Sequence, residues 1–328
     1  IRGEVGTEVK LLIYRAGEAD KVYNIVRDNI TIKTVAGKML DDKKTGLITI
    51  SQFARITVEQ YQKTYKELQD QGMKQMILDN FGSNFDIKQP KMIIVGLCGG
   101  QGGGKTKLSK ILSKNVKKSA IIEERSYFKV MNSKRKLSID EKPLFDEIGG
   151  YNKDRKLLLV ELSNPASYNY EKLYQNLKSL KEGQPISVSK FDEDLGNYTG
   201  KEITIKPNET YMVILEGYFI FRDEKVKSLI DLKIYVEIDD DIRLSRLLTN
   251  ENKFLNNNPL AIKNFFMIYK NYIKTSYQQY IEPTKHEAKI NLPNYTVRDD
   301  EVINGDETFK SLILMLNSIV ERRASFKK

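Results

Sequence analysis

The chain has 328 residues, of which 40% are hydrophobic and 30% are charged, as in ordinary globular proteins. This length predicts two domains, or one large domain with an extension, and a core that needs neither disulfides nor metals. Lysine and arginine outnumber aspartate and glutamate by 54 to 44, so the net charge of +10 favours anionic partners such as nucleotides or an acidic protein surface. The basic residues are scattered, which argues against a nucleic-acid-binding module.

Two rare residue types exclude whole classes of site. Cys98 is the only cysteine, which excludes an internal disulfide framework and predicts a buried, inert thiol. His286 is the only histidine, which excludes a histidine-cluster metal site and argues against a Ser-His-Asp triad. No segment approaches the length of a membrane span, because the most apolar run, residues 211–221, is interrupted by Glu216. Since the chain begins with Ile1 rather than Met, whether a targeting segment was removed stays an open question. We expect a soluble intracellular protein, in the cytoplasm or the mitochondrial matrix.

Residues 1–90 differ from the rest and are predicted to form an accessory segment, either α+β or helical. Alternating apolar residues within 9–13 predict a short strand. Apolar residues spread over 58–79 predict one amphipathic helix. Glycine and proline residues within 82–90 predict a boundary, so that the second domain covers residues 91–328.

The run from Asp41 to Gln52 resembles an EF-hand loop, with Asp41 at the first position and Gly46 at the sixth. A calcium loop needs oxygen ligands at positions three and five and a bidentate glutamate at position twelve. Those positions hold Lys43, Thr45 and Gln52, so we expect a glycine-containing turn rather than a calcium site.

From residue 91 onward, predicted strands and helices alternate, which indicates an α/β fold with a parallel sheet covered on both faces. The predicted strands span residues 92–97, 120–122, 211–215 and 232–238. The predicted helices span residues 105–114, 170–181, 241–249, 259–281 and 307–322.

A glycine-rich loop joins the first strand of this region to its helix. The pattern G-x-x-x-x-G-K-[ST] is satisfied by Gly99, Gly100, Gln101, Gly102, Gly103, Gly104, Lys105 and Thr106. Glycines let successive backbone N–H groups point at phosphate oxygens, and the following helix presents its positive N-terminal end. Lys105 is expected to reach the β- and γ-phosphates and Thr106 to ligate Mg²⁺. The sequence therefore predicts a P-loop NTPase-type domain that binds ATP, or ADP or GTP.

Residues 92–320 also resemble the uridine kinase family and its phosphoribulokinase-like relatives, in the family's order and spacing. The similar segments are 95–106 (opening strand and P-loop), 164–170 (H-P-D-A-F-D), 180–186 (helix end and loop), 213–217 (I-L-E-G), 239–246 (D-x-D-x-R-L-x-R) and 282–288 (E-P-T-K-x-x-A). The resemblance implies ATP-dependent, Mg²⁺-dependent phosphorylation of the 5′-hydroxyl of uridine or cytidine.

By the same resemblance, the phosphate and metal roles fall on Lys105, Thr106 and Glu216, and catalytic lid roles fall on Arg243 and Arg246. Glu216 ends an apolar strand, where a carboxylate is costly unless it meets a cation or water. A metal-linked role for Glu216 is therefore expected.

The position of the family's catalytic base departs from this pattern. The family's D-S-F-Y run, whose aspartate acts as base and magnesium partner, reads Arg125-Ser126-Tyr127-Phe128 here. An arginine can neither accept the proton nor bind Mg²⁺. Glu124 could substitute only if the backbone shifted by one residue, since neighbouring residues of a strand point to opposite sides. Arg125 is a candidate to replace part of the magnesium charge near the phosphates.

The nucleoside pocket and the lid depart as well. The family's acidic residue before H-P-D falls at Ser163, and its base-recognising tyrosine and histidine fall at Phe191 and Gly196. The further lid arginines expected near Leu247 and Asn250 are absent. Lost hydrogen-bonding groups weaken discrimination, and lost positive charge lowers the transfer rate by orders of magnitude.

These departures favour a nucleotide-binding family member with lost or weakened kinase activity and a structural or assembly role. A protein partner would dock through residues 1–90 or through the basic surface. The first alternative is an active kinase for uridine, cytidine or another small hydroxyl substrate, with Glu124 as base. The second is a regulator whose nucleotide occupancy controls a partner interface.

Overall fold

The computed structural model describes residues 4, 6–14, 21–27, 33–51, 57–79, 92–129, 151–294 and 307–325. The boundary predicted within residues 82–90 lies outside this set, as does Gln52. Among the described residues, no helix combines the length and the apolar character needed to cross a bilayer.

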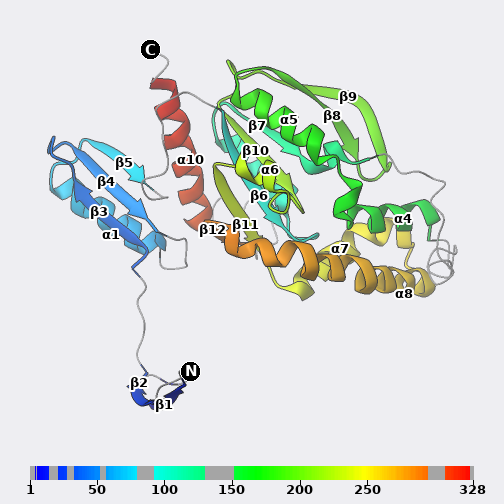
Figure 1. Ribbon diagram of the computed structural model, residues 1–328, viewed down its shortest axis with the longest axis horizontal. Coiled ribbons are helices and arrows are strands. Elements are labelled where there is room, and N and C mark those ends of the chain that lie inside the picture. The colour runs from blue at the N-terminus through cyan, green and yellow to red at the C-terminus, as the bar shows by residue number, and fades with distance from the viewer. Residues whose placement is uncertain are drawn as a thin grey trace.

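A five-stranded parallel sheet with the order β12-β11-β6-β10-β7 forms the centre of the fold (Figure 1). Its strands are β6 (Ile93–Gly99), β7 (Ser119–Glu123), β10 (Met212–Gly217), β11 (Leu232–Glu237) and β12 (Ile290–Pro293). Strand β10 inserts between β6 and β7, so the carboxyl ends of all three meet at one edge. The predicted P-loop NTPase-type α/β fold is confirmed.

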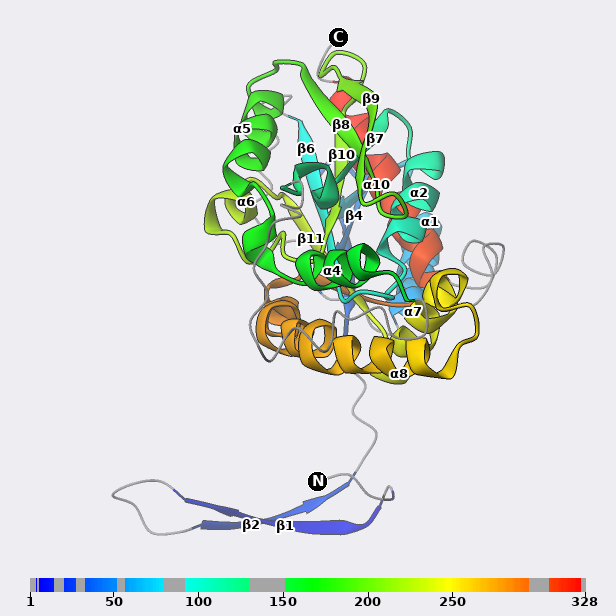
Figure 2. The same cartoon turned by 90° about the vertical axis from the view of Figure 1, so that its right-hand side faces the viewer.

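Helices cover both faces of this sheet because its strands are apolar on both sides. Along β10, Val213 and Leu215 belong to one core cluster, while Met212 and Ile214 belong to the other. On one face lie α5 (Tyr170–Lys181) and α6 (Glu224–Ser228), and on the other lie α2 (Lys105–Asn115) and α10 (Glu307–Ser325) (Figure 2).

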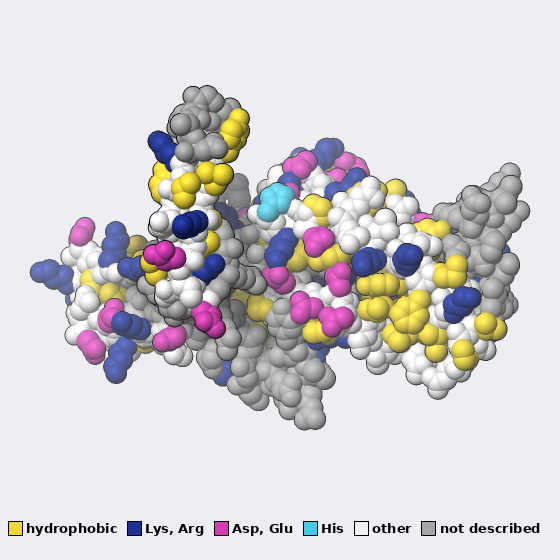
Figure 3. All heavy atoms as spheres, turned by 90° about the horizontal axis from the view of Figure 1, so that it is seen from below, with side chains coloured by type: hydrophobic (Ala, Val, Ile, Leu, Met, Phe, Trp, Pro, Cys, Tyr) yellow, Lys and Arg dark blue, Asp and Glu magenta, His cyan; other side chains and the backbone are white. Residues whose placement is uncertain are grey.

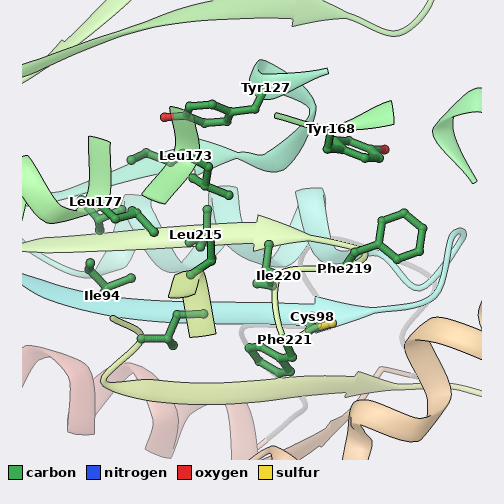
Figure 4. Close-up of a cluster of buried hydrophobic side chains, with 14 of the residues drawn as sticks. Ile94, Cys98, Tyr127, Tyr168, Leu173, Leu177, Leu215, Phe219, Ile220 and Phe221 are labelled. Atoms are coloured by element: carbon green, nitrogen blue, oxygen red, sulfur yellow. The ribbon is translucent and has the colours of Figure 1, made fainter. Parts of the chain in front are cut away.

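Helix α5 shows how its sequence sets its place on the sheet. The Asn169 side chain accepts a hydrogen bond from the Lys172 N–H and caps the helix. Leu173, Leu177 and Leu180 then recur at helical spacing and are buried against the sheet. Figure 4 shows Leu173 and Leu177 in this cluster.

A second helical layer lies beside the carboxyl edge of the sheet. It comprises α4 (Lys153–Leu162), α7 (Asp240–Leu255) and α8 (Pro259–Ile268), followed by π-helical turns at Tyr269–Lys274 and Tyr277–Ile281 and a 3₁₀ helix at Glu282–Glu287. An antiparallel hairpin of β8 (Ile186–Asp192) and β9 (Asn197–Ile205) packs by Ile186, Val188 and Phe191 into the α5-side core. The predicted helix 259–281 is therefore three segments, and neither α4 nor the hairpin was expected.

The amino-terminal part contains a small sheet, β3 (Val35–Met39), β4 (Thr45–Ile50) and β5 (Gln75–Asp79), with α1 (Thr57–Asp70) against it. The predicted helix 58–79 is wrong beyond Asp70. Gly72, with a φ of 93°, follows the helix end, and β5 pairs in parallel with β4. Helix α1 also contacts α10.

Within the described part of the EF-hand-like run, residues 41–44 form the hairpin turn between β3 and β4. Gly46 was expected in the turn but lies in β4, where it pairs with Met39, because the turn closes before it. Asp42 Oδ1 accepts hydrogen bonds from the Lys44 and Thr45 backbone N–H groups, so the carboxylate stabilises the turn itself.

The first strand predicted, within residues 9–13, is confirmed as β1 (Glu8–Ile13), which pairs with β2 (Lys21–Val26). This hairpin exposes apolar side chains (Figure 3), namely Leu12, Ile13, Tyr14, Val22, Tyr23, Ile25 and Val26.

Candidate functional site

The P-loop leaves β6 at the carboxyl edge of the sheet and ends at the first turn of α2. Gly102 and Gly104 have φ angles of 73° and 85°, in the left-handed region that favours glycine. A Cβ atom at Gly102 would lie 2.5 Å from the Arg243 carbonyl oxygen, and one at Gly104 would collide with the Asn294 side chain. Glycine at these two positions therefore allows both the left-handed backbone of the loop and its close packing against Arg243 and Asn294.

Lys105 is buried at the base of this loop. Its Nζ donates to the Gly100 carbonyl at 2.9 Å and lies 4.0 Å from the centroid of the Tyr218 ring. Burial lowers the pKa of Lys105 to about 8, although the Glu216 carboxylate opposes the shift. An arriving phosphate would favour the charged form of this lysine.

Thr106 and Glu216, the two residues expected to ligate Mg²⁺, contact each other. The Thr106 hydroxyl donates to Glu216 Oε1 at 2.9 Å and to Oε2 at 3.0 Å. Burial raises the pKa of Glu216, and the charges of Arg125 and Lys105 act in the opposite direction.

Arg125 fills the space beside this pair. Its Nη2 donates to Thr106 Oγ1 at 3.0 Å and to Glu216 Oε1 at 3.3 Å. Its Nε donates to Glu123 Oε2 at 2.8 Å, and its Nη1 donates to Glu193 Oε2 at 2.7 Å. Burial alone would lower the pKa of Arg125, but these carboxylates outweigh it and raise that pKa. The guanidinium is therefore a fixed positive charge.

Glu124 lines the same pocket as Arg125, contrary to the expectation that the two side chains diverge. That expectation assumed an extended strand, whereas residues Glu124–Tyr127 form a 3₁₀ helix. The Glu124 carboxylate accepts hydrogen bonds from the Tyr218 N–H at 2.6 Å, the Phe219 N–H at 3.2 Å and the Tyr170 hydroxyl at 3.1 Å. Burial is the largest effect on its pKa, which rises to about 7.

These side chains surround a pocket of about 250 Å³, including its open mouth. It is lined by Lys105, Thr106, Glu124, Arg125, Glu216, Gly217 and Tyr218. Two cations and the N-terminus of α2 suit it to a phosphate group.

The residues that would hold Mg²⁺ do not fit the ion as they stand. Thr106 and Glu216 offer oxygen ligands, but the Arg125 guanidinium contacts both of them. Within the described residues, no group of three or more His, Cys, Asp or Glu side chains is arranged to hold a metal. A metal ion between Thr106 and Glu216 would have to displace an arginine that three carboxylates hold.

Arg243 and Arg246, the two arginines expected in lid roles, border the P-loop from α7. Arg243 is 1% exposed, its Nη1 lies 3.5 Å from the Gln101 carbonyl, and its guanidinium lies 3.6 Å from the centroid of the Tyr277 ring. Its Nη2 also pairs with Asp240. Arg246 Nη2 donates to the Asn294 carbonyl at 3.2 Å.

The positions expected to recognise a nucleoside contact other parts of the protein. Ser163 Oγ accepts from Gln101 Nε2 at 3.0 Å and donates to the Leu159 carbonyl. Phe191 is 3% exposed, with its ring centroid 5.2 Å from that of Phe128. Gly196 lies in the β8–β9 turn with a φ of 62°. Ser163 and Phe191 therefore serve internal packing and hydrogen bonding.

Two carboxylates of the site, Glu123 and Glu193, were not predicted from the sequence. Glu123 pairs in register with Glu216 across the sheet, and its place two residues before Arg125 was an available signal. Glu193 comes from the distant β8–β9 loop, so nothing in the sequence connected it with Arg125. Its backbone carbonyl also accepts a hydrogen bond from Arg155, which pairs with Glu251 of α7.

The sheet order, the P-loop and the buried glutamate at the end of β10 define a P-loop protein of the kinase type. The family model described as Phosphoribulokinase / Uridine kinase family matches residues 94–301, and the chain belongs to this family.

Its relatives include uridine kinases from bacteria. The uridine kinase of Streptococcus agalactiae serotype III (strain NEM316) is 28% identical over 205 residues, 62% of this chain and 87% of the relative. That of Borrelia duttonii (strain Ly) is 30% identical over 200 residues, 61% of this chain and 85% of the relative. Among solved structures, the D-glycerate 3-kinase of Cryptococcus neoformans var. grubii aligns over 58% of this chain and 79% of its own, with 16% identity and a TM-score of 0.37.

Proposed function

We propose that this chain binds ATP, or ADP or GTP, in its P-loop and phosphorylates nucleosides weakly or not at all. The observation that carries the proposal is the position of Arg125. Its guanidinium donates to Thr106 and to Glu216, the two groups that the family resemblance assigns to Mg²⁺.

Phosphoryl transfer needs a carboxylate that takes the hydroxyl proton and a metal that spreads the developing charge. Arg125 supplies neither, since a guanidinium stays protonated and has no acceptor atom. Loss of a general base alone slows a reaction by about 10²- to 10⁴-fold. The packing of Ser163 and Phe191 also supports loss of a nucleoside pocket.

In this proposal, residues 91–328 form the nucleotide-binding domain and residues 1–90 form an accessory segment with a structural or assembly role. The apolar side chains exposed by the β1–β2 hairpin, Tyr14 and Val22 among them, support docking of a protein partner there.

The alternative is an active kinase for uridine, cytidine or another small hydroxyl substrate. The bacterial uridine kinase relatives favour it, and so does Glu124, which lines the pocket with a pKa raised to about 7 by burial. A base with such a pKa is well matched to neutral pH. Against it, both Glu124 oxygens already accept hydrogen bonds from the Phe219 N–H.

Coupled spectrophotometry with ATP, Mg²⁺ and a panel of nucleosides and sugars separates the two functions, beside a titration of nucleotide binding. The proposal predicts saturable ATP binding, weakened at least about tenfold in Lys105→Ala and retained in Lys110→Ala, with little or no substrate-dependent turnover. Lys110 is a suitable control because it is an exposed lysine of the same helix, α2. Turnover that disappears in both Lys105→Ala and Glu124→Gln would establish the alternative.

A further inference from the structure

Arg125 is held from three separate elements. Glu123 belongs to β7, Glu216 to β10 and Glu193 to the β8–β9 loop, and each contacts a different nitrogen of the guanidinium. The Arg125 side chain is 18% exposed and that of Glu216 is 4% exposed. If Arg125 turned away, Glu216 would lose a partner in a buried site, which is strongly unfavourable.

This arrangement places a cation where nucleotide binding needs one. A bound triphosphate would bring negative charge close to Glu216, whose carboxylate would repel it without a cation between them. A guanidinium has five N–H donors, and its four contacts with Glu123, Glu193, Thr106 and Glu216 leave one N–H for a phosphate oxygen. Arginine is also the side chain best shaped for phosphate.

Resting on the proposed nucleotide binding, we infer that the site takes a nucleoside triphosphate free of magnesium, with the Arg125 guanidinium in the place of the metal. Lys105 supplies the second positive charge from the P-loop itself. A magnesium ion brought in by the nucleotide would meet Arg125 at the Thr106 and Glu216 oxygens and would be repelled there.

The test compares the affinity of the full chain for a fluorescent ATP analogue in Mg²⁺ and in EDTA. We expect the two dissociation constants to agree within about threefold, because the Arg125 guanidinium already supplies positive charge at the place where Mg²⁺ would bind. If the affinity were at least about tenfold weaker in EDTA, the inference would be overturned. A change of that size corresponds to about one charge-assisted hydrogen bond.

Variants then assign the effect to Arg125. In EDTA, Arg125→Ala should bind the analogue at least about tenfold more weakly than the native chain. Arg125→Lys, which keeps the charge, should lose less. Arg222→Ala should bind like the native chain, since Arg222 is an exposed arginine outside the pocket lining. Equal binding in EDTA by native chain and folded Arg125→Ala would refute the role of Arg125.

The outcomes also separate this inference from the function on which it rests. Failure of the native chain to bind the analogue in either buffer would refute nucleotide binding itself. Binding in Mg²⁺ but not in EDTA would leave nucleotide binding intact and refute only the inference. If circular dichroism shows that Arg125→Ala does not fold, two measurements still test the inference. These are the affinity of the native chain in Mg²⁺ against EDTA and the affinity of Arg125→Lys in EDTA.

Discussion

Replacing Glu124 tests the electrostatics of the pocket. The side chain is 2% exposed, and burial is the largest effect in raising its pKa from 4.5 to about 7, against the hydrogen bonds from Tyr218, Phe219 and Tyr170. Between these two pH values, the folded state holds a proton that the unfolded state has released. The stability that this carboxyl contributes is therefore fully present below pH 4.5 and is lost as the pH rises through about 7. The difference amounts to about 3 kcal/mol.

We predict that Glu124→Gln abolishes this loss. Glutamine keeps the size of the side chain, its Oε1 can accept from the Tyr218 N–H, and its Nε2 can donate to the Tyr170 hydroxyl. The free energies of unfolding of variant and native chain should agree within about 1 kcal/mol at pH 5. At pH 8 the variant should be the more stable by up to about 3 kcal/mol.

Urea denaturation followed by circular dichroism at pH 5 and pH 8 measures this difference. Glu209→Gln, which removes an exposed carboxylate, provides the matched control and should respond to pH like the native chain. If the gap between Glu124→Gln and the native chain were the same at both pH values, the assigned burial of charge at Glu124 would be refuted.

Three further predictions concern the loop and its supports. Lys105→Ala should weaken ATP binding at least about tenfold, the loss of one charge-assisted contact, while Lys110→Ala should not, by isothermal titration. Gly104→Ala should destabilise the chain by about 1–2 kcal/mol in urea, since φ is 85° and the added Cβ would meet Asn294; unchanged stability would contradict this packing. Arg155→Ala should cost about 3–5 kcal/mol, because it removes the cation from the buried Glu251 carboxylate, which the Tyr151 hydroxyl still contacts. A loss below about 1 kcal/mol would show that the pair is not buried in solution.

The sequence predicted the central fold because its signals are local. The strand before the P-loop is continuously apolar, and the loop and helix follow without a gap. Residues 75–79 were misread as helix because a short apolar run fits either period, and only pairing with β4 decides for a strand.

The parts of the site that were predictable are those set by a residue's type and its place in a local motif, as with Lys105, Thr106 and the charge of Arg125. It was not predictable where distant elements meet. Glu193 reaches Arg125 from a hairpin that the sequence did not reveal, and the 3₁₀ helix turns Glu124 into the pocket. Both features depend on tertiary packing rather than on any pattern near Arg125.

A crystal structure of the full chain grown with ATP and Mg²⁺ tests the central claim most directly. We predict triphosphate in the P-loop, with the Arg125 guanidinium within hydrogen-bonding distance of a phosphate oxygen and still in contact with Thr106 and Glu216. A magnesium ion ligated by Thr106, with Arg125 turned away from Glu216, would contradict the account.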